Sequence, residues 1–221
     1  MLRRNQGATT LRSCLPRFPH LKTIRLPFVD GVKQPFYWFG GRVFLDWKDS
    51  FPIHLENVIQ GMIAARKSGV AIRTFEVSGF YSQLTVGDNE LSGMMTEALH
   101  NVQDLRLIDS PNLLEFMATI SLGSVRRLEL ETCWLCVRDL EQFVITNAKT
   151  LQFLYLEDTW VAAANTHYWG LSLCDSSPET IVANIACIRE LGILRGVTIN
   201  RENADGYEYR EDFGRLSVKH Y

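Results

Sequence analysis

The segment VRRLELETCWLCVRDLEQFV, residues 125–144, contains the pattern on which the fold prediction rests. Its apolar residues Val125, Leu128 and Leu130 stand at positions n, n+3 and n+5. The last two are two residues apart, so their side chains point to the same side of a short β-strand. The second half of the segment, DLEQFV, has the apolar spacing of an amphipathic helix. A strand followed by a helix is therefore predicted.

The same apolar template recurs along the chain. Its members are Leu21, Ile24 and Leu26; Ile72, Phe75 and Val77; Val102, Leu105 and Leu107; Val125, Leu128 and Leu130; Leu151, Leu154 and Leu156; and Ile188, Leu191 and Ile193. Stretches with helical period separate these strands and are predicted at 55–63, 91–99, 113–120, 140–144 and 181–185. Start and stop signals accompany them, such as Asp88 before the second helix and Ser68-Gly69 after the first. The chain is thus predicted to be an α/β protein made of internal repeats.

The spacing of the repeats favours one α/β architecture over another. Val77, Leu107, Leu130 and Leu156 are separated by 30, 23 and 26 residues, close to the roughly 20 to 29 residues of a leucine-rich repeat. A doubly wound domain would also alternate strands and helices, but its strands are near-continuous apolar runs. Here polar residues stand between the leucines. We therefore predict an irregular leucine-rich-repeat solenoid, with parallel strands on one face and helices on the other.

Three segments also resemble a known family. VRRLELETCWLCVRDLEQFV, LQFLYLEDTW and VQDLRLIDSP are similar to the cysteine-containing leucine-rich repeats of F-box proteins, and the upstream FPHLKTIRL and LENVIQGMIAARKSGVAIRTFEV resemble fungal members in particular. The resemblance implies a repeat region that holds a protein for ubiquitination. The F-box itself is not found, since Leu15-Pro16 is followed by Arg17-Phe18 rather than by an acidic and apolar helix start. The resemblance therefore implies partner binding without ubiquitin ligation.

The repeats also divide the chain. Residues 1–10 are predicted to be a disordered tail, 11–199 the leucine-rich-repeat domain, and 200–221 either a cap or a tail. Two long intervals imply aromatic-rich insertions at 27–52 and 158–177, which we expect to cap or flank the core because so many aromatic side chains are costly to expose. Terminal repeats need a polar outer surface, which favours a C-terminal cap.

The candidate binding site follows from the strand period. Residues at n+2, n+4 and n+6 point away from the leucines, toward the open face of the strands. The predicted protein-binding residues on this face are Arg106, Arg127, Glu129, Glu131, Phe153, Tyr155 and Glu157. Mixed charge beside aromatic side chains is typical of protein-recognition surfaces, although a solvated sheet face is the alternative interpretation. The sequence thus predicts a non-catalytic protein-protein interaction scaffold.

The alternative function is that of a thiol-disulfide oxidoreductase using Cys133 and Cys136, which follow a predicted strand and precede a predicted helix. A buried structural role for these cysteines is the competing interpretation. A zinc site needs about four ligands, and Cys174, Cys187 and His167 do not form a second short-spaced pair. Phosphate-binding and nucleophile-elbow motifs are also missing. We therefore expect no metal, no cofactor and no catalysis.

Composition excludes several function classes. The 221 residues carry 23 basic and 25 acidic side chains, a net charge of −2, so nucleic acid is not an expected partner. No apolar run approaches the roughly 20 residues that span a membrane. Five cysteines without a regular pairing pattern suit a reducing compartment. A cytoplasmic or nuclear protein is expected, with mitochondrial targeting as the alternative because residues 1–29 contain arginines but no acidic residue.

Overall fold

The protein is a mixed α/β structure built on a parallel sheet. The computed structural model describes residues 4–28, 47–85, 87–162, 183, 185–200, 207–212 and 215–220. In this part of the chain six parallel strands lie side by side in chain order: β1 (Thr23–Pro27), β2 (Thr74–Ser78), β3 (Asp104–Ile108), β4 (Arg127–Glu131), β6 (Phe153–Glu157) and β8 (Gly196–Asn200). The short strands β5 (Trp134–Cys136) and β7 (Trp160–Ala162) form a separate parallel pair.

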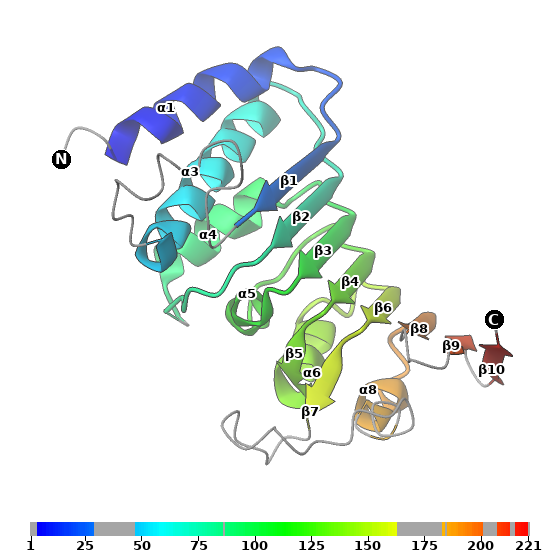
Figure 1. Ribbon diagram of the computed structural model, residues 1–221. Coiled ribbons are helices and arrows are strands. Elements are labelled where there is room, and N and C mark those ends of the chain that lie inside the picture. The colour runs from blue at the N-terminus through cyan, green and yellow to red at the C-terminus, as the bar shows by residue number, and fades with distance from the viewer. Residues whose placement is uncertain are drawn as a thin grey trace.

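The described helices lie along one side of the strands, as Figure 1 shows. They are α1 (Arg4–Cys14), the 3₁₀ turn η1 (Leu15–Arg17), α3 (Trp47–Lys67), α4 (Asn89–Ala98), α5 (Pro111–Met117), α6 (Val137–Thr146) and α8 (Ala186–Glu190). The outermost helix, α1, packs closely on α3. A Cβ atom at Gly61 would lie 2.9 Å from Leu11 Cβ, so the close approach of these two helices requires glycine at that position.

Burial alternates along the strands as the sequence pattern predicts. In β2 and β3 every second side chain is buried and those between are half-buried. The parallel register sets Phe75, Leu105, Leu128 and Leu154 side by side, and the next inward row continues across the same strands. These rows join the inner faces of the helices in one hydrophobic core. The apolar positions n+3 and n+5 therefore hold the sheet against the helices.

The strands end in a repeated turn. Gly79, Asp109, Thr132 and Asp158 follow β2, β3, β4 and β6 and all have positive φ, between 44° and 71°. The next residue in three of these turns is a buried Ser110, Cys133 or Thr159 whose side chain donates hydrogen bonds to strand carbonyls. Thr159 Oγ1, for example, donates to Leu130 O and Glu157 O, both at 2.9 Å. These bonds satisfy backbone acceptors that would otherwise be buried without partners.

One buried amide performs the same task at the opposite end of the sheet. Asn147, 2% exposed, accepts a hydrogen bond from Leu122 N at 2.7 Å through its Oδ1. Its Nδ2 donates to Ile120 O at 3.3 Å and to Phe143 O at 3.0 Å. The side chain therefore joins the end of α6 to the loop that leads into β4.

Helix boundaries confirm several of the sequence signals. Asp88 caps α4, accepting from the backbone N–H groups of Glu90 and Leu91 at 3.0 Å. Gly69 follows α3 with a φ of 86°, a left-handed conformation typical of helix ends. The helix predicted at 140–144 begins earlier, at Val137, so Asp139 lies in its first turn.

The sixth strand was predicted in the wrong place. Ile188 of the expected strand IRELGI lies in α8 instead, and Gly192, with a φ of 63°, lies just beyond that helix. The strand β8 uses Val197 and Ile199, which follow Leu194 in the same n, n+3, n+5 template. Two overlapping apolar patterns occur here, and the helical one continues through Ile188 because nothing before Gly192 interrupts it.

The predicted domain boundaries also need correction at the N-terminus. Residues 4–10, expected to be disordered, form the first part of α1, and Ala8 is buried. The insertion expected at 27–52 is shorter, since β1 ends at Pro27 and α3 begins at Trp47. The second expected insertion, at 158–177, contains β7 near its start. Residues 29–46 and 163–177 lie outside the described residues.

Beyond β8, the chain continues the sheet with a hairpin. Strands β9 (Tyr207–Asp212) and β10 (Arg215–His220) pair antiparallel with each other, and β9 pairs antiparallel with β8. Residues 200–221 were expected to form a cap or a tail. In the described part of this range, β9 occupies the edge of β8.

Candidate functional site

The predicted binding residues lie together on the strand face that the described helices leave uncovered. Five of them belong to two neighbouring registers across β3, β4 and β6. Arg106, Glu129 and Tyr155 are aligned in one row, and Glu131 and Glu157 lie in the next. Arg127 and Phe153 form a further aligned pair. We call the outward side chains of β1, β2, β3, β4 and β6 the strand face.

A line of ion pairs crosses the strand face. Arg106 pairs with Glu131, with Glu129 (Nε to Oε2, 3.4 Å) and with Glu76 (Nη1 to Oε2, 3.8 Å). Burial opposes ionisation of this guanidinium, but the carboxylates around it outweigh that effect and the pKa of Arg106 is raised. Arg106 is therefore a fixed positive centre.

Two residues of this line were missed by the sequence analysis. Arg25 of β1 and Glu76 of β2 form an ion pair at 3.4 Å, and Glu76 also pairs with Arg106. Both occupy position n+4 of their repeats, the position also held by Arg106, Glu129 and Tyr155. Their signal was thus present in the template, and reading the n+4 position across all the repeats would have found them.

The aromatic part of the strand face lies on β6. The guanidinium of Arg127 stands over the ring of Tyr155, 5.7 Å from its centroid, and also pairs with Glu129 at 2.6 Å. Phe153 is 45% exposed and lies beside Gly196 of β8, where a Cβ atom would approach Phe153 Cδ1 to 3.2 Å. Phe153 is therefore a large apolar side chain held open to solvent beside charged groups.

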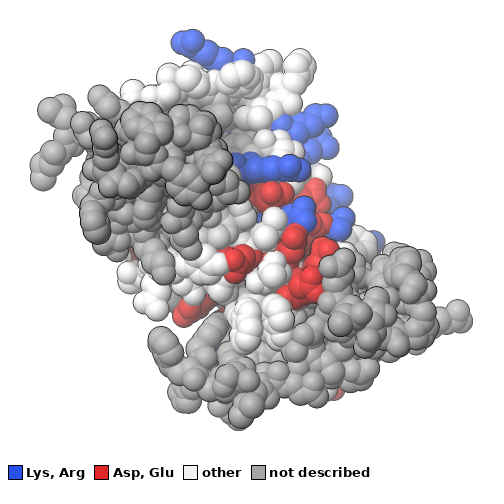
Figure 2. Space-filling model, in the orientation of Figure 1, with Lys and Arg blue, Asp and Glu red and all other residues white. Residues whose placement is uncertain are grey.

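Negative charge accumulates where β4 and β6 end. Glu131 and Glu157 are direct neighbours in the register of these two strands. Burial and the nearby carboxylate of Glu131 raise the pKa of Glu157, and Arg106 only partly opposes this. Figure 2 shows the acidic side chains gathered in the middle of this view, with basic side chains beyond them.

Neutralising Glu157 is expected to stabilise the fold. The pKa of Glu157 is higher in the folded than in the unfolded protein, so the ionised side chain opposes folding. The cost to stability appears as the pH rises from the unfolded pKa to the folded pKa. We expect Glu157→Gln to raise the free energy of unfolding by about 0.5 kcal/mol at neutral pH. The gain should disappear below about pH 4, where the unfolded carboxyl is also protonated. Urea unfolding at both pH values measures it.

Glu129→Gln is the matched control, because this neighbouring carboxylate lies between Arg106 and Arg127. It should lower stability at neutral pH. If both substitutions changed stability in the same direction, the assignment of Glu157 as a carboxylate whose ionisation is opposed by burial and by Glu131 would be wrong.

Of the two cysteines of the alternative function, Cys133 is buried and Cys136, the last residue of β5, is half-buried. Cys133 is fully buried, and its Sγ lies 3.3 Å from Glu131 O and 3.5 Å from Leu107 O. Burial raises the pKa of its thiol to about 11. A nucleophilic cysteine needs the opposite, an accessible thiol with a lowered pKa. Cys133 therefore acts as the structural counterpart of Ser110 and Thr159 in the strand-end turns.

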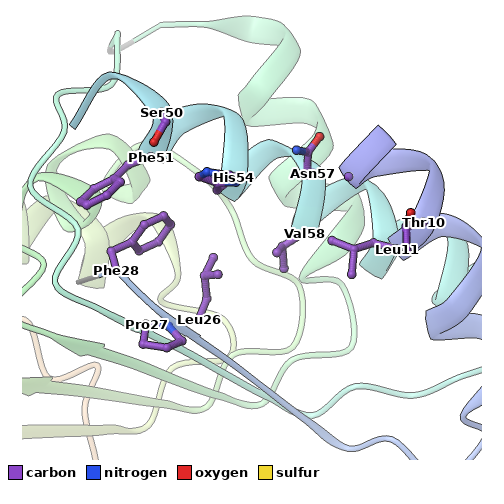
Figure 3. Close-up of a pocket in the computed structure, with 11 residues that line it drawn as sticks. Thr10, Leu11, Leu26, Pro27, Phe28, Ser50, Phe51, His54, Asn57 and Val58 are labelled. Carbon is purple, nitrogen blue, oxygen red and sulfur yellow. The ribbon is translucent and has the colours of Figure 1, made fainter. Parts of the chain in front are cut away.

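A cavity of about 530 Å³ lies away from the strand face, between α1, β1 and α3 (Figure 3). Phe28 and Phe51 border one end, with ring centroids 4.6 Å apart, and Thr10 and Leu11 border the other. Its lining is mainly apolar, with polar groups from His54 and Asn57 among others. Its size lies within the range of small-molecule sites, but it contains none of the predicted site residues.

Comparisons with known proteins add no assignment: no family model, no curated protein and no solved structure matches the chain. Within the described residues, no three His, Cys, Asp or Glu side chains are placed to hold a metal ion together. None of the described helices combines the length and the apolar character needed to cross a membrane. The geometry of the strand face therefore carries the functional argument.

Proposed function

We propose that the protein is a non-catalytic binding module that holds another protein on the strand face. The observation that carries this proposal is that, in the described part of the chain, no helix lies on this face. Parallel sheets are generally covered on both faces, whereas here the described helices lie on one side and Phe153 is 45% exposed on the other. A partner would cover the side that the described helices do not.

The composition of the strand face supports this role. Aromatic and arginine side chains dominate binding energy at protein interfaces, and Phe153, Tyr155, Arg106 and Arg127 lie close together across β3, β4 and β6. Ion pairs already orient the two arginines, so less side-chain entropy is lost when a partner docks. The like charges of Glu131 and Glu157 are a further feature that a basic group of a partner would relieve.

We also assign the chain to the irregular leucine-rich-repeat solenoids. The shared template, the chain-order register of six parallel strands and the repeated strand-end turn support this assignment. In such proteins each repeat contacts its neighbours and the strands offer an extended surface. The resemblance to F-box repeat regions suggests a protein held for ubiquitination as the class of partner.

A pair of alanine substitutions tests the proposal. Phe153 and Ile145 are 45% and 46% exposed, but Phe153 lies on the strand face and Ile145 on α6. Tagged wild-type protein and both variants are used to capture partners from native extract, which are then quantified by mass spectrometry. We expect Phe153→Ala to reduce the bound partner about tenfold or more, and Ile145→Ala to leave it unchanged.

Circular dichroism of both variants verifies that each is folded. Equal recovery of the same partners by Phe153→Ala and wild-type protein would overturn the proposal, as would loss of binding in Ile145→Ala alone.

A further inference from the structure

A second row of charge lies beside the strand face, at the edge where the strands begin. The residues at n+1, directly before the strands, are Lys22, Arg73, Gln103, Arg126, Gln152 and Arg195. Backbone hydrogen bonds join them in order across the sheet, from Arg73 N to Lys22 O at 2.7 Å through to Arg195 N to Gln152 O at 2.7 Å. Four of the six side chains are cationic, and we call these four the basic edge.

The basic edge differs from the arginines of the strand face in its partners. Arg25, Arg106 and Arg127 are each held by glutamates. Lys22, Arg73, Arg126 and Arg195 are exposed and form no ion pair within the described part of the chain. Basic side chains lie at the margin of the surface in Figure 2, beside the acidic ones. Their charges are available to a ligand.

The register sets the spacing of these charges. Neighbouring strands lie about 4.8 Å apart. Arg73 and Arg126 precede β2 and β4, and Arg195 precedes β8, so each step crosses two strand spacings, roughly 10 Å. An extended polypeptide advances about 3.3 Å per residue. Carboxylates at every third residue of an extended segment would therefore match the three arginines of the basic edge, while Lys22 lies one strand spacing beyond Arg73.

We propose that the basic edge binds an extended acidic segment of the protein partner, with Asp or Glu at every third residue. This inference rests on the proposed function and specifies the chemistry of the partner. A narrow peptide fits better than a nucleic acid, because Glu76, Glu129, Glu131 and Glu157 lie on the adjoining strand face and would repel a broad polyanion. The net charge of −2 also disfavours binding of a broad polyanion.

Peptide binding to the full-length chain tests the inference. A fluorescent peptide with Glu at every third position between Gly and Ser residues is compared with one of the same composition whose glutamates are contiguous. Anisotropy is measured at about 50 mM and 200 mM salt. We expect the spaced peptide to bind at least about fivefold more tightly, and its affinity to fall at the higher salt concentration.

Charge reversals identify the site. Arg73→Glu with Arg126→Glu should weaken binding of the spaced peptide about tenfold or more at low salt. The control combines Arg12→Glu on α1 with Arg138→Glu on α6, which changes the net charge equally and should alter affinity less than twofold. Equal losses in the two double variants, equal affinity for both peptides, or no binding would overturn the inference.

A single-stranded oligonucleotide of similar charge completes the test. Tighter binding of the oligonucleotide than of the spaced peptide would replace the acidic segment with nucleic acid as the ligand of this edge and overturn the inference. The capture experiment with Phe153→Ala is independent of these peptides. If the peptides do not bind but partner capture still depends on Phe153, only this inference is rejected. If partner capture does not depend on Phe153, the proposed function is rejected.

Discussion

Replacing Leu130 with alanine is expected to lower the free energy of unfolding by about 2–5 kcal/mol. Leu130 is fully buried in β4, with Leu107 and Leu156 as its register neighbours on either side. The truncation removes apolar contacts in the middle of the sheet, where strands on both sides limit relaxation into the cavity. Guanidinium or urea unfolding followed by circular dichroism measures the loss.

The adjacent residue provides the control. Glu131 is the next residue of the same strand and points to the strand face. Glu131→Ala removes an ion-pair partner of Arg106 but also the like charge beside Glu157, so the change should stay within about 1 kcal/mol. A loss as large as that of Leu130→Ala would contradict the alternation of core and open positions along β4.

Replacing Asn147 with alanine is expected to cost about 2–4 kcal/mol. The substitution removes Oδ1, the acceptor of the hydrogen bond from Leu122 N–H. It also removes Nδ2, which donates to Ile120 O and Phe143 O, and all three bonds are buried. Each buried backbone group left without a partner costs about 1–3 kcal/mol, and partial access of water offsets some of the sum. The same unfolding measurement applies.

Asn112→Ala separates this effect from loss of an ordinary amide. Asn112 Nδ2 donates one hydrogen bond, to Tyr81 O at 2.7 Å, in exposed surroundings. Its removal should cost less than about 1 kcal/mol. If Asn147→Ala proved no more harmful than Asn112→Ala, the side chain of Asn147 would not be what fixes the loop before β4.

The strand template predicted most of the sheet because its physical basis is local. Side chains two residues apart share a face of a strand, so Leu105 with Leu107 and Leu154 with Leu156 could be assigned to the core without knowledge of the register. The template failed at Ile188, where helical and strand spacings coincide. Deciding between them depends on tertiary packing and on where Gly192 ends the helix, which apolar spacing alone does not show.

The candidate site was predictable in its residues but not in its contacts. The outward positions of β3, β4 and β6 follow from the same period of two. The pairing of Arg106 with Glu76, by contrast, depends on which strands are neighbours in the sheet. The helices between the strands differ in length, so the sequence spacing does not show this directly. The buried role of Asn147 is also non-local, because its partners Ile120 and Leu122 precede it by more than twenty residues.

The most direct test of the central claim is a site-specific crosslink to the partner. A photoreactive aromatic amino acid is introduced in place of Phe153 on the strand face or of Ile145 on α6, two positions of nearly equal exposure. After illumination in native extract, mass spectrometry identifies the attached chains. The account predicts a specific protein adduct at position 153 and none at position 145. An adduct formed only from position 145, or equally from both, would contradict it.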